Sequence, residues 1–143
     1  MNRQDFQRLA LERLEDAQAL LRAGRHSGSY YLGGYAVECA LKACLARQTN
    51  QDDFPPKDAA RYYAHNVQDL RDRLGLRSPS LGSELDADEQ ADQQLAANWA
   101  IIKDWTEEAR YEARGWTQQQ AETLVSAISD PDHGVLQWLR RYW

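Results

Sequence analysis

Four residues close together in the chain have the side-chain types that bind nucleotides and single-stranded nucleic acid. They occupy one seven-residue stretch and are Arg110, Tyr111, Arg114 and Trp116. Arginine offers a planar set of donors for phosphate oxygens, and an aromatic ring offers a face on which a base stacks. The alternative is structural: the aromatic rings pack the end of a helical bundle with Trp105, while Arg110 bonds to a carboxylate. The sequence leaves both interpretations open.

The segment 30–46 is apolar except for one glutamate and one lysine. Glu38 and Lys42 are four residues apart, in the order that favours an ion pair within a helix, worth about 0.2–0.5 kcal/mol at an exposed position. They either form a buried structural pair that also meets Arg13 or Arg110, or line a polar cleft that contacts a phosphate or ribose. Either way, loss of one partner destabilises the fold, because an unpaired buried charge is costly.

The third kind of candidate is a histidine. His65 titrates in a range that suits acid–base work, but the sequence gives it no nucleophile or metal ligand as a companion, so it fits a loop anchored by a hydrogen bond equally well. His26 and His133 are expected in surface turns. The acidic residues of 86–92 lack the glycine and the ligand spacing of a calcium loop. We expect them to begin a solvated helix, and we expect no metal and no cofactor.

Helical periodicity dominates the sequence, and strand signals are nearly absent. The predicted helices cover 4–23, 28–47, 67–74, 87–113 and 117–139, the last either kinked at Pro131 or divided there into two closely stacked pieces. Connections are expected at 48–64, which contains two prolines, and at 76–86, which is rich in Ser, Pro and Gly. The second helix is apolar on all sides, so it is either central or faces a second subunit. The prediction is an all-α, antiparallel up-and-down bundle of four long helices and one short helix.

Composition sets further limits. The chain has 143 residues and 43% hydrophobic residues, which predicts one domain over 1–143 with a real core. The net charge is −5 and no segment is strongly basic, which argues against duplex DNA as a partner. Cys39 and Cys44 would be separated by about 7.5 Å of helical rise, beyond the reach of a disulfide, so we expect buried free thiols.

The location of the protein is a further expectation. The first residues contain no apolar run of the kind found in a signal peptide. No stretch approaches the 18 or so apolar residues of a membrane-spanning helix. We therefore expect a cytoplasmic protein that does not bind membranes.

Five segments in order resemble the HEPN domain family. They are Leu20–Gly24, Tyr30–Ala43 with its Glu followed by Leu-Lys, His65–Leu70, Trp105–Tyr111 with its Arg-Tyr pair, and Ala121–Leu139. The resemblance spans nearly the whole chain and implies a bundle of four or five helices that is often dimeric. Some HEPN domains are ribonucleases of toxin–antitoxin, CRISPR and RNA-processing systems. Others are noncatalytic partners of minimal nucleotidyltransferases, or nucleotide-binding modules.

The ribonuclease members share an arginine, four to six intervening residues and then a histidine. This chain departs from that pattern, because residues 115–117, where a histidine would follow Arg110, are Gly, Trp and Thr. The expected function is therefore a noncatalytic nucleotide- or RNA-associated module, paired with a minimal nucleotidyltransferase in a toxin–antitoxin or defence setting. A homodimer through the second helix and part of the last is also expected. The alternatives are a ribonuclease with a degenerate motif and a pure protein–protein interaction domain.

Overall fold

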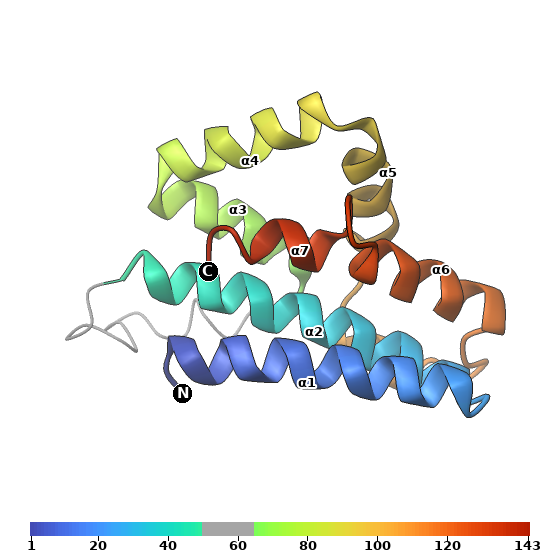
Figure 1. Cartoon of the computed structure of the whole chain (residues 1–143). Helices are drawn as coiled ribbons and strands as arrows, with labels where there is room; N and C mark the ends of the chain where they lie inside the picture. The colour runs from blue at the N-terminus through green and yellow to red at the C-terminus, as the bar shows by residue number, and fades with distance from the viewer. Residues whose placement is uncertain (50–64) are drawn as a thin grey trace.

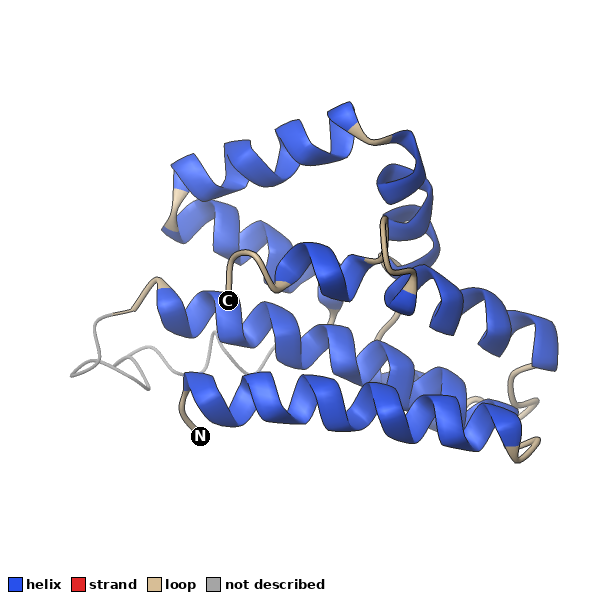
Figure 2. Ribbon diagram, in the orientation of Figure 1, coloured by secondary structure: helices blue, strands red, loops and turns tan. Residues whose placement is uncertain are grey.

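The computed structural model describes residues 1–49 and 65–143 of the chain. These residues form an all-α structure (Figures 1 and 2), with no strand beyond one isolated bridge between Asn66 and Thr106 in the part described. The elements are α1 (Arg3–Arg22), α2 (His26–Arg47), α3 (Val67–Arg77), α4 (Pro79–Ala91), α5 (Gln93–Ile102), the 3-10 helix η3 (Glu107–Tyr111), α6 (Gln118–Ser129) and α7 (Val135–Leu139). The all-α class is confirmed.

The first two helices form an antiparallel pair whose ends agree with the sequence signals (Figure 1). Asn2 caps α1 in a reciprocal capping box with Asp5. Gly24 follows the end of α1 at a φ of 76°, a left-handed conformation that glycine adopts without steric cost. The chain can therefore reverse at once into α2.

Helix α2 is the centre of the molecule. It contacts α1, α3, α6, α7 and η3, and thirteen of its 22 residues are buried. Two glycines permit the closest approaches: a Cβ on Gly33 would lie 3.4 Å from Ile128 of α6, and one on Gly34 would lie 2.1 Å from the Trp105 indole. One chain thus covers the helix that is apolar on all sides, which accounts for its composition without a second subunit.

The prediction of a loop at 76–86 is wrong. Ser78 caps a new helix by accepting from the backbone N–H of Leu81, and Pro79 occupies its first turn, so α4 begins where a break was expected. The Ser-Pro pair reads as a loop signal, but a serine followed by a proline is also a favourable helix start. Helices α3, α4 and α5 form a layer over α2 and α7 (Figure 1).

The predicted helix 87–113 is also divided. The Asp92 side chain accepts from the backbone N–H groups of Gln94 and Leu95, which ends α4 and begins α5. The acidic run expected at a helix start therefore falls on the last turns of α4. Helix α5 ends at Ile102, and a 3-10 helix follows in place of its continuation.

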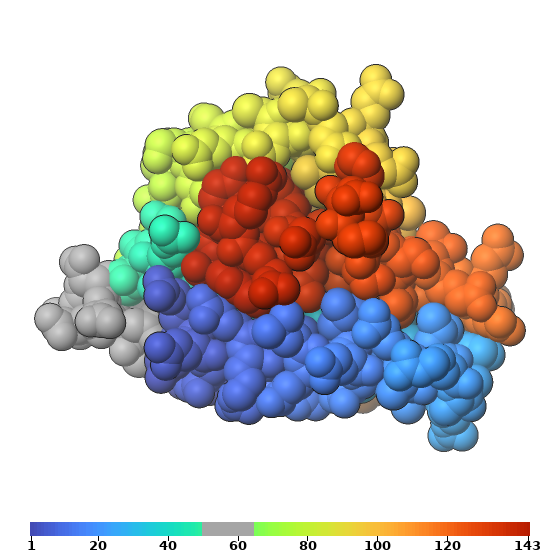
Figure 3. All heavy atoms as spheres, viewed as in Figure 1, coloured from blue at the N-terminus to red at the C-terminus, as the bar shows by residue number. Residues whose placement is uncertain are grey.

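The last segment forms two helices, α6 and α7, which confirms the expectation of two pieces at Pro131 and not that of one kinked helix. A capping box between Thr117 and Gln120 begins α6. A turn joins α6 to the short α7, where a Cβ on Gly134 would lie 2.3 Å from the Asp130 carbonyl oxygen. The C-terminal segment fills the space between α1 and the α3–α4 layer on the face shown in Figure 3. The predicted connection at 50–64 lies outside the described residues.

Candidate functional site

Glu38 and Lys42 form a close ion pair on α2. The Lys42 Nζ lies 2.7 Å from Glu38 Oε1, and the two side chains are 11% and 1% exposed. Arg13, one expected further partner, pairs with Glu12 and Asp16 of its own helix. Arg110, the other, forms no ion pair with a described residue. The structure therefore shows Glu38 and Lys42 as a buried ion pair, as one interpretation had it. Neither Arg13 nor Arg110, one of which was expected to join the pair, does so.

The third member of this polar centre is His65. Its Nδ1 lies 2.8 Å from Glu38 Oε1 and 3.7 Å from Glu107 Oε2. Because a carboxylate paired with a lysine accepts hydrogen bonds, Nδ1 carries the proton and donates to Glu38. The backbone N–H of Glu107 also donates to the His65 carbonyl over 3.1 Å. His65 thus anchors the segment before α3 to both α2 and η3, and the ring is 37% exposed.

Two buried polar atoms near this centre have no hydrogen-bond partner among the described residues. One is Glu38 Oε2, the second oxygen of the carboxylate, and the other is Trp105 Nε1. The Trp105 ring lies directly over Gly34, and its side chain is 2% exposed. A buried polar group without a hydrogen-bond partner costs about 1–3 kcal/mol of folding stability. Each of these two atoms therefore lowers the stability of the fold.

Arg110 is exposed and lies among tyrosines. Its guanidinium carbon is 4.6 Å from the centre of the Tyr111 ring, and a hydrogen bond to Tyr31 is the main cause that raises the pKa of Arg110 above its ordinary value. Among the residues described, no carboxylate forms an ion pair with it. The alternative in which Arg110 bonds to a carboxylate is therefore not what the structure shows, and its charge is available to a ligand.

The 3-10 helix brings Arg110 and His65 to one surface. Side chains three residues apart are eclipsed in a 3-10 helix, so Glu107 and Arg110 lie on the same side of η3. Glu107 faces His65, while Arg110 faces Tyr31. On α2, Tyr31 stacks near Tyr35, with ring centres 6.2 Å apart. A row of polar and aromatic groups therefore runs along α2 beneath η3.

Trp116 is held between the start of α2 and η3. Its ring stacks on Tyr30 with centres 3.8 Å apart and planes 10° apart. Its Nε1 donates to the Ala109 carbonyl over 3.0 Å, and its backbone N–H donates to Ser27 Oγ over 2.9 Å. Trp116 and Tyr111 line one hollow together, so the predicted cluster stays together around η3. Tyr111 is 71% exposed beside Arg110, and Arg114 is exposed on the loop between them and Trp116.

Two hollows flank Trp116. The larger, about 660 Å³, is bordered by η3, and its lining includes Tyr111 and the three glutamates Glu107, Glu108 and Glu112. The smaller, about 390 Å³, lies between Tyr30, Ile101 and the first turns of α6. Three carboxylates disfavour a phosphate in the larger hollow. A phosphate near η3 is therefore favoured at Arg110 over the larger hollow.

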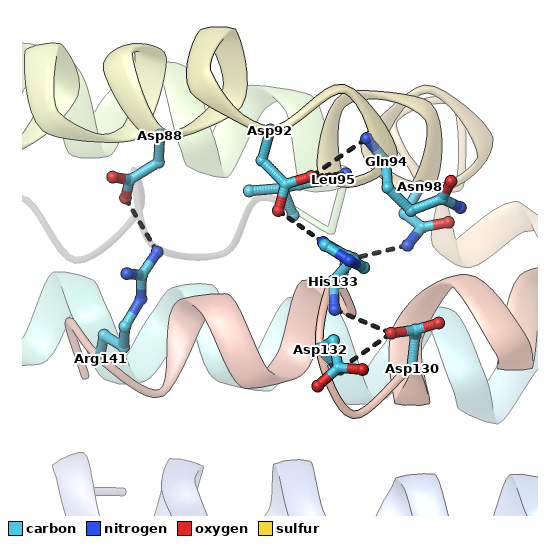
Figure 4. Close-up of polar contacts among 9 residues, drawn as sticks. All are labelled: Asp88, Asp92, Gln94, Leu95, Asn98, Asp130, Asp132, His133 and Arg141. Carbon is cyan, nitrogen blue, oxygen red and sulfur yellow. Dashed lines mark hydrogen bonds and ion pairs between the residues drawn. The ribbon is translucent and has the colours of Figure 1, made fainter.

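A second histidine–carboxylate contact lies away from this surface (Figure 4). His133 Nδ1 is 2.7 Å from Asp92 Oδ2, and the Asn98 amide donates to the His133 carbonyl over 2.9 Å. The hydrogen bond with Asp92 raises the pKa of His133 and lowers the pKa of Asp92. Asp130 accepts from the backbone N–H of His133, which also lowers the pKa of Asp130. This cluster joins α5 to the α6–α7 turn.

Sequence analysis placed His133 in a plain surface turn and missed this partner. The sequence signal at Asp92 is its propensity to cap a helix. That propensity does not predict a contact between Asp92 and His133, which are 41 positions apart in the chain. His26 was also expected in a turn, yet it begins α2, and its Nδ1 is buried with no partner in the part of the chain described. Cys39 and Cys44 are free and buried, as predicted, and burial raises the pKa of each thiol to about 12.

No group of three metal-ligating side chains occurs within residues 1–49 and 65–143. In the same two ranges, no helix is both long and apolar enough to cross a membrane. The fold and the polar centre on α2 define a small helical-bundle domain whose central helix carries a buried carboxylate.

The family follows from a direct match. The model of the HEPN domain family matches residues 4–130, nearly the whole chain, so this chain belongs to the HEPN domain family. HEPN domains are nucleotide-binding or ribonuclease-associated modules. No curated protein and no solved structure matches the chain.

Proposed function

We propose that this chain is a noncatalytic HEPN module that binds a nucleotide or single-stranded RNA at the surface formed by Arg110, Tyr111 and Tyr31. The observation that carries the proposal is the state of Arg110, which is exposed, in contact with two tyrosines and free of any ion pair with a described residue. A cationic guanidinium beside aromatic rings binds phosphates and stacked bases. Lys42 and His65 add polar groups along the same face of α2.

Thermal unfolding with and without nucleotides and short RNAs tests this proposal. A ligand at 100 times its dissociation constant adds about 2.7 kcal/mol to stability, and we expect such a shift to disappear in Arg110→Ala. Arg22→Ala, at the exposed end of α1, is the matched control and keeps the shift. If no nucleotide or RNA changes the unfolding temperature, the proposal is wrong, and a protein–protein interaction domain becomes the better interpretation.

A ribonuclease with a degenerate motif is a second candidate, and one observation favours it. Glu38 holds His65 through Nδ1, so Nε2 of a ring that is 37% exposed has no bond to a described residue. A histidine oriented by a carboxylate is a common general base. This candidate predicts RNA cleavage by the purified protein that both Arg110→Ala and His65→Ala abolish. Intact RNA after incubation at high protein concentration would exclude it.

Partners are proposed on family membership alone. We propose a minimal nucleotidyltransferase as the partner chain, in a toxin–antitoxin or defence setting, because HEPN domains occur in such pairs. The test is co-purification of the two chains when the neighbouring gene encodes such an enzyme. We also propose a homodimer, which sedimentation of the purified chain tests. Because α2 is covered within one chain, a dimer would use other surfaces as well as any exposed part of α2.

A further inference from the structure

The smaller hollow beside Trp116 differs from the larger in charge. Its apolar walls are Tyr30, Ile101 and Trp116, and its polar side is formed by residues of α6. Its lining contains no acidic, basic or histidine side chain. Its one tyrosine, Tyr30, stays neutral because burial, with a smaller effect of Asp104, raises its pKa. The two hollows thus select different ligands: the larger disfavours anions, and the smaller accepts a neutral group.

The aromatic wall of this hollow is fixed before any ligand arrives. The Trp116 ring is stacked on Tyr30, its indole N–H is bonded to Ala109, and its backbone N–H is bonded to Ser27. The residue before it, Gly115, has a φ of 68°, and its Cβ position would lie 2.7 Å from Ser27 Oγ. A rigid aromatic surface needs little ordering when a flat ligand packs against it, which favours binding.

The polar side offers both donors and acceptors. Gln119 and Thr123 lie four residues apart and hence on the same face of α6. Both are exposed, and neither side chain bonds to another described residue. Gln120 also lines the hollow, but its Oε1 already accepts from the Thr117 backbone. A free amide and a free hydroxyl can each donate and accept.

We propose that this neutral hollow binds a nucleobase, packed at the Trp116 wall and hydrogen-bonded by Gln119 and Thr123. The inference rests on the proposed nucleotide or RNA binding and names where the base goes. Unstacked bases are recognised by aromatic side chains together with hydrogen bonds to their edges. Trp116 is bonded to Ala109, the residue before Arg110, so the wall for the base is tied to the same short helix that carries the phosphate-binding arginine.

Uncharged nucleosides isolate this hollow from Arg110. Adenosine, guanosine, cytidine and uridine are titrated into the full chain by calorimetry, and the Trp116 indole N–H resonance is followed by NMR after assignment with Trp116→Phe. We expect at least one nucleoside to bind and to shift that resonance. Thr123→Leu replaces the hydroxyl that bonds the base with an apolar branch and should weaken binding by about tenfold or more, equivalent to roughly 1.4 kcal/mol. Ser126→Leu likewise exchanges a hydroxyl for a leucine side chain, at an exposed site of α6 outside the hollow, and binding should persist.

Gln119→Leu provides a second variant, since it removes the free amide at an exposed position without disturbing the cap of α6. The inference is overturned if no nucleoside binds, or if binding is equal in wild type, Thr123→Leu and Gln119→Leu. If nucleotide binding is lost in Arg110→Ala but is unchanged in Thr123→Leu and Gln119→Leu, the proposed base site is wrong while the proposed function stands. If neither nucleotides nor nucleosides bind, both proposals fail.

Discussion

The molecule contains two contacts between a histidine and a carboxylate that look alike in distance and differ in burial. His65 lies 2.8 Å from Glu38, and His133 lies 2.7 Å from Asp92. The Glu38 side chain is 1% exposed, whereas Asp92 is 31% exposed. Water therefore reaches the Asp92 carboxylate but hardly reaches the Glu38 carboxylate. Burial, and not the hydrogen-bond distance, should therefore decide how much each contact contributes to stability.

The largest expected effect follows from removal of the buried carboxylate. Glu38→Ala leaves the Lys42 ammonium group, 11% exposed, without its carboxylate, and we expect a loss of about 3–5 kcal/mol in the free energy of unfolding. Urea unfolding measures it. The corresponding variant at the exposed contact, Asp92→Ala, removes the cap of α5 as well as the bond to His133 and should still cost less. Equal losses in the two variants would contradict the comparison.

The next effect concerns the two histidines themselves. His65→Ala removes a hydrogen bond to a buried charge, and such bonds are worth about 1.5–3 kcal/mol. His133→Ala removes a bond at a site open to solvent, so we expect a smaller change. The midpoints of urea unfolding for the two variants, measured side by side at one pH, test the order. A larger loss for His133→Ala would reverse the interpretation.

A double replacement sharpens the argument about burial. Substituting Glu38→Leu together with Lys42→Met removes both buried charges and keeps the volume of the two side chains. Exchange of a buried ion pair for apolar groups is often neutral or stabilising, so the double variant should regain most of the stability lost in Glu38→Ala. If the double variant unfolds as easily as the single one, the pair contributes through specific bonds, such as the one to His65.

The smallest effect depends on pH and belongs to the exposed contact. The folded-state pKa of His133 lies above its ordinary value of 6.5, so its contribution is complete below that pH and is lost as pH rises through the folded pKa. The lowered pKa of Asp92 acts in the opposite sense: its contribution is present above 3.8 and is lost as pH falls. The difference in melting temperature between wild type and His133→Gln should therefore shrink above neutral pH. A constant difference would refute this.

The parts of the structure that local rules control could be predicted from the sequence. The first two helices follow from their apolar periodicity and from Gly24 at the end of α1, and the Glu38–Lys42 pair follows from a spacing of four residues on a helix. The α4–α5 region was misplaced because Ser78-Pro79 has two opposite meanings, and because the Asp92 side chain ends one helix in the middle of a stretch with continuous helical periodicity.

Contacts between distant segments could not be derived in the same way. Glu38 and His65 are 27 positions apart, and Trp116 and Ser27 are 89 positions apart. No periodicity or spacing connects such residues, because their contact depends on how separate helices pack. The sequence therefore predicted which polar and aromatic residues are candidates, but not that Trp116 stacks on Tyr30 of α2.

The contacts of Trp116 with Tyr30 and Ser27 also have a consequence for the order of events during folding. Helices α1 and α2 are joined by a short turn and can pair early, since contacts between neighbouring segments close quickly. The bond from Trp116 to Ser27 closes a loop of 89 positions, so it forms only after the intervening helices have collapsed onto α2. We expect the stacking of Trp116 on Tyr30 to be among the last steps in refolding.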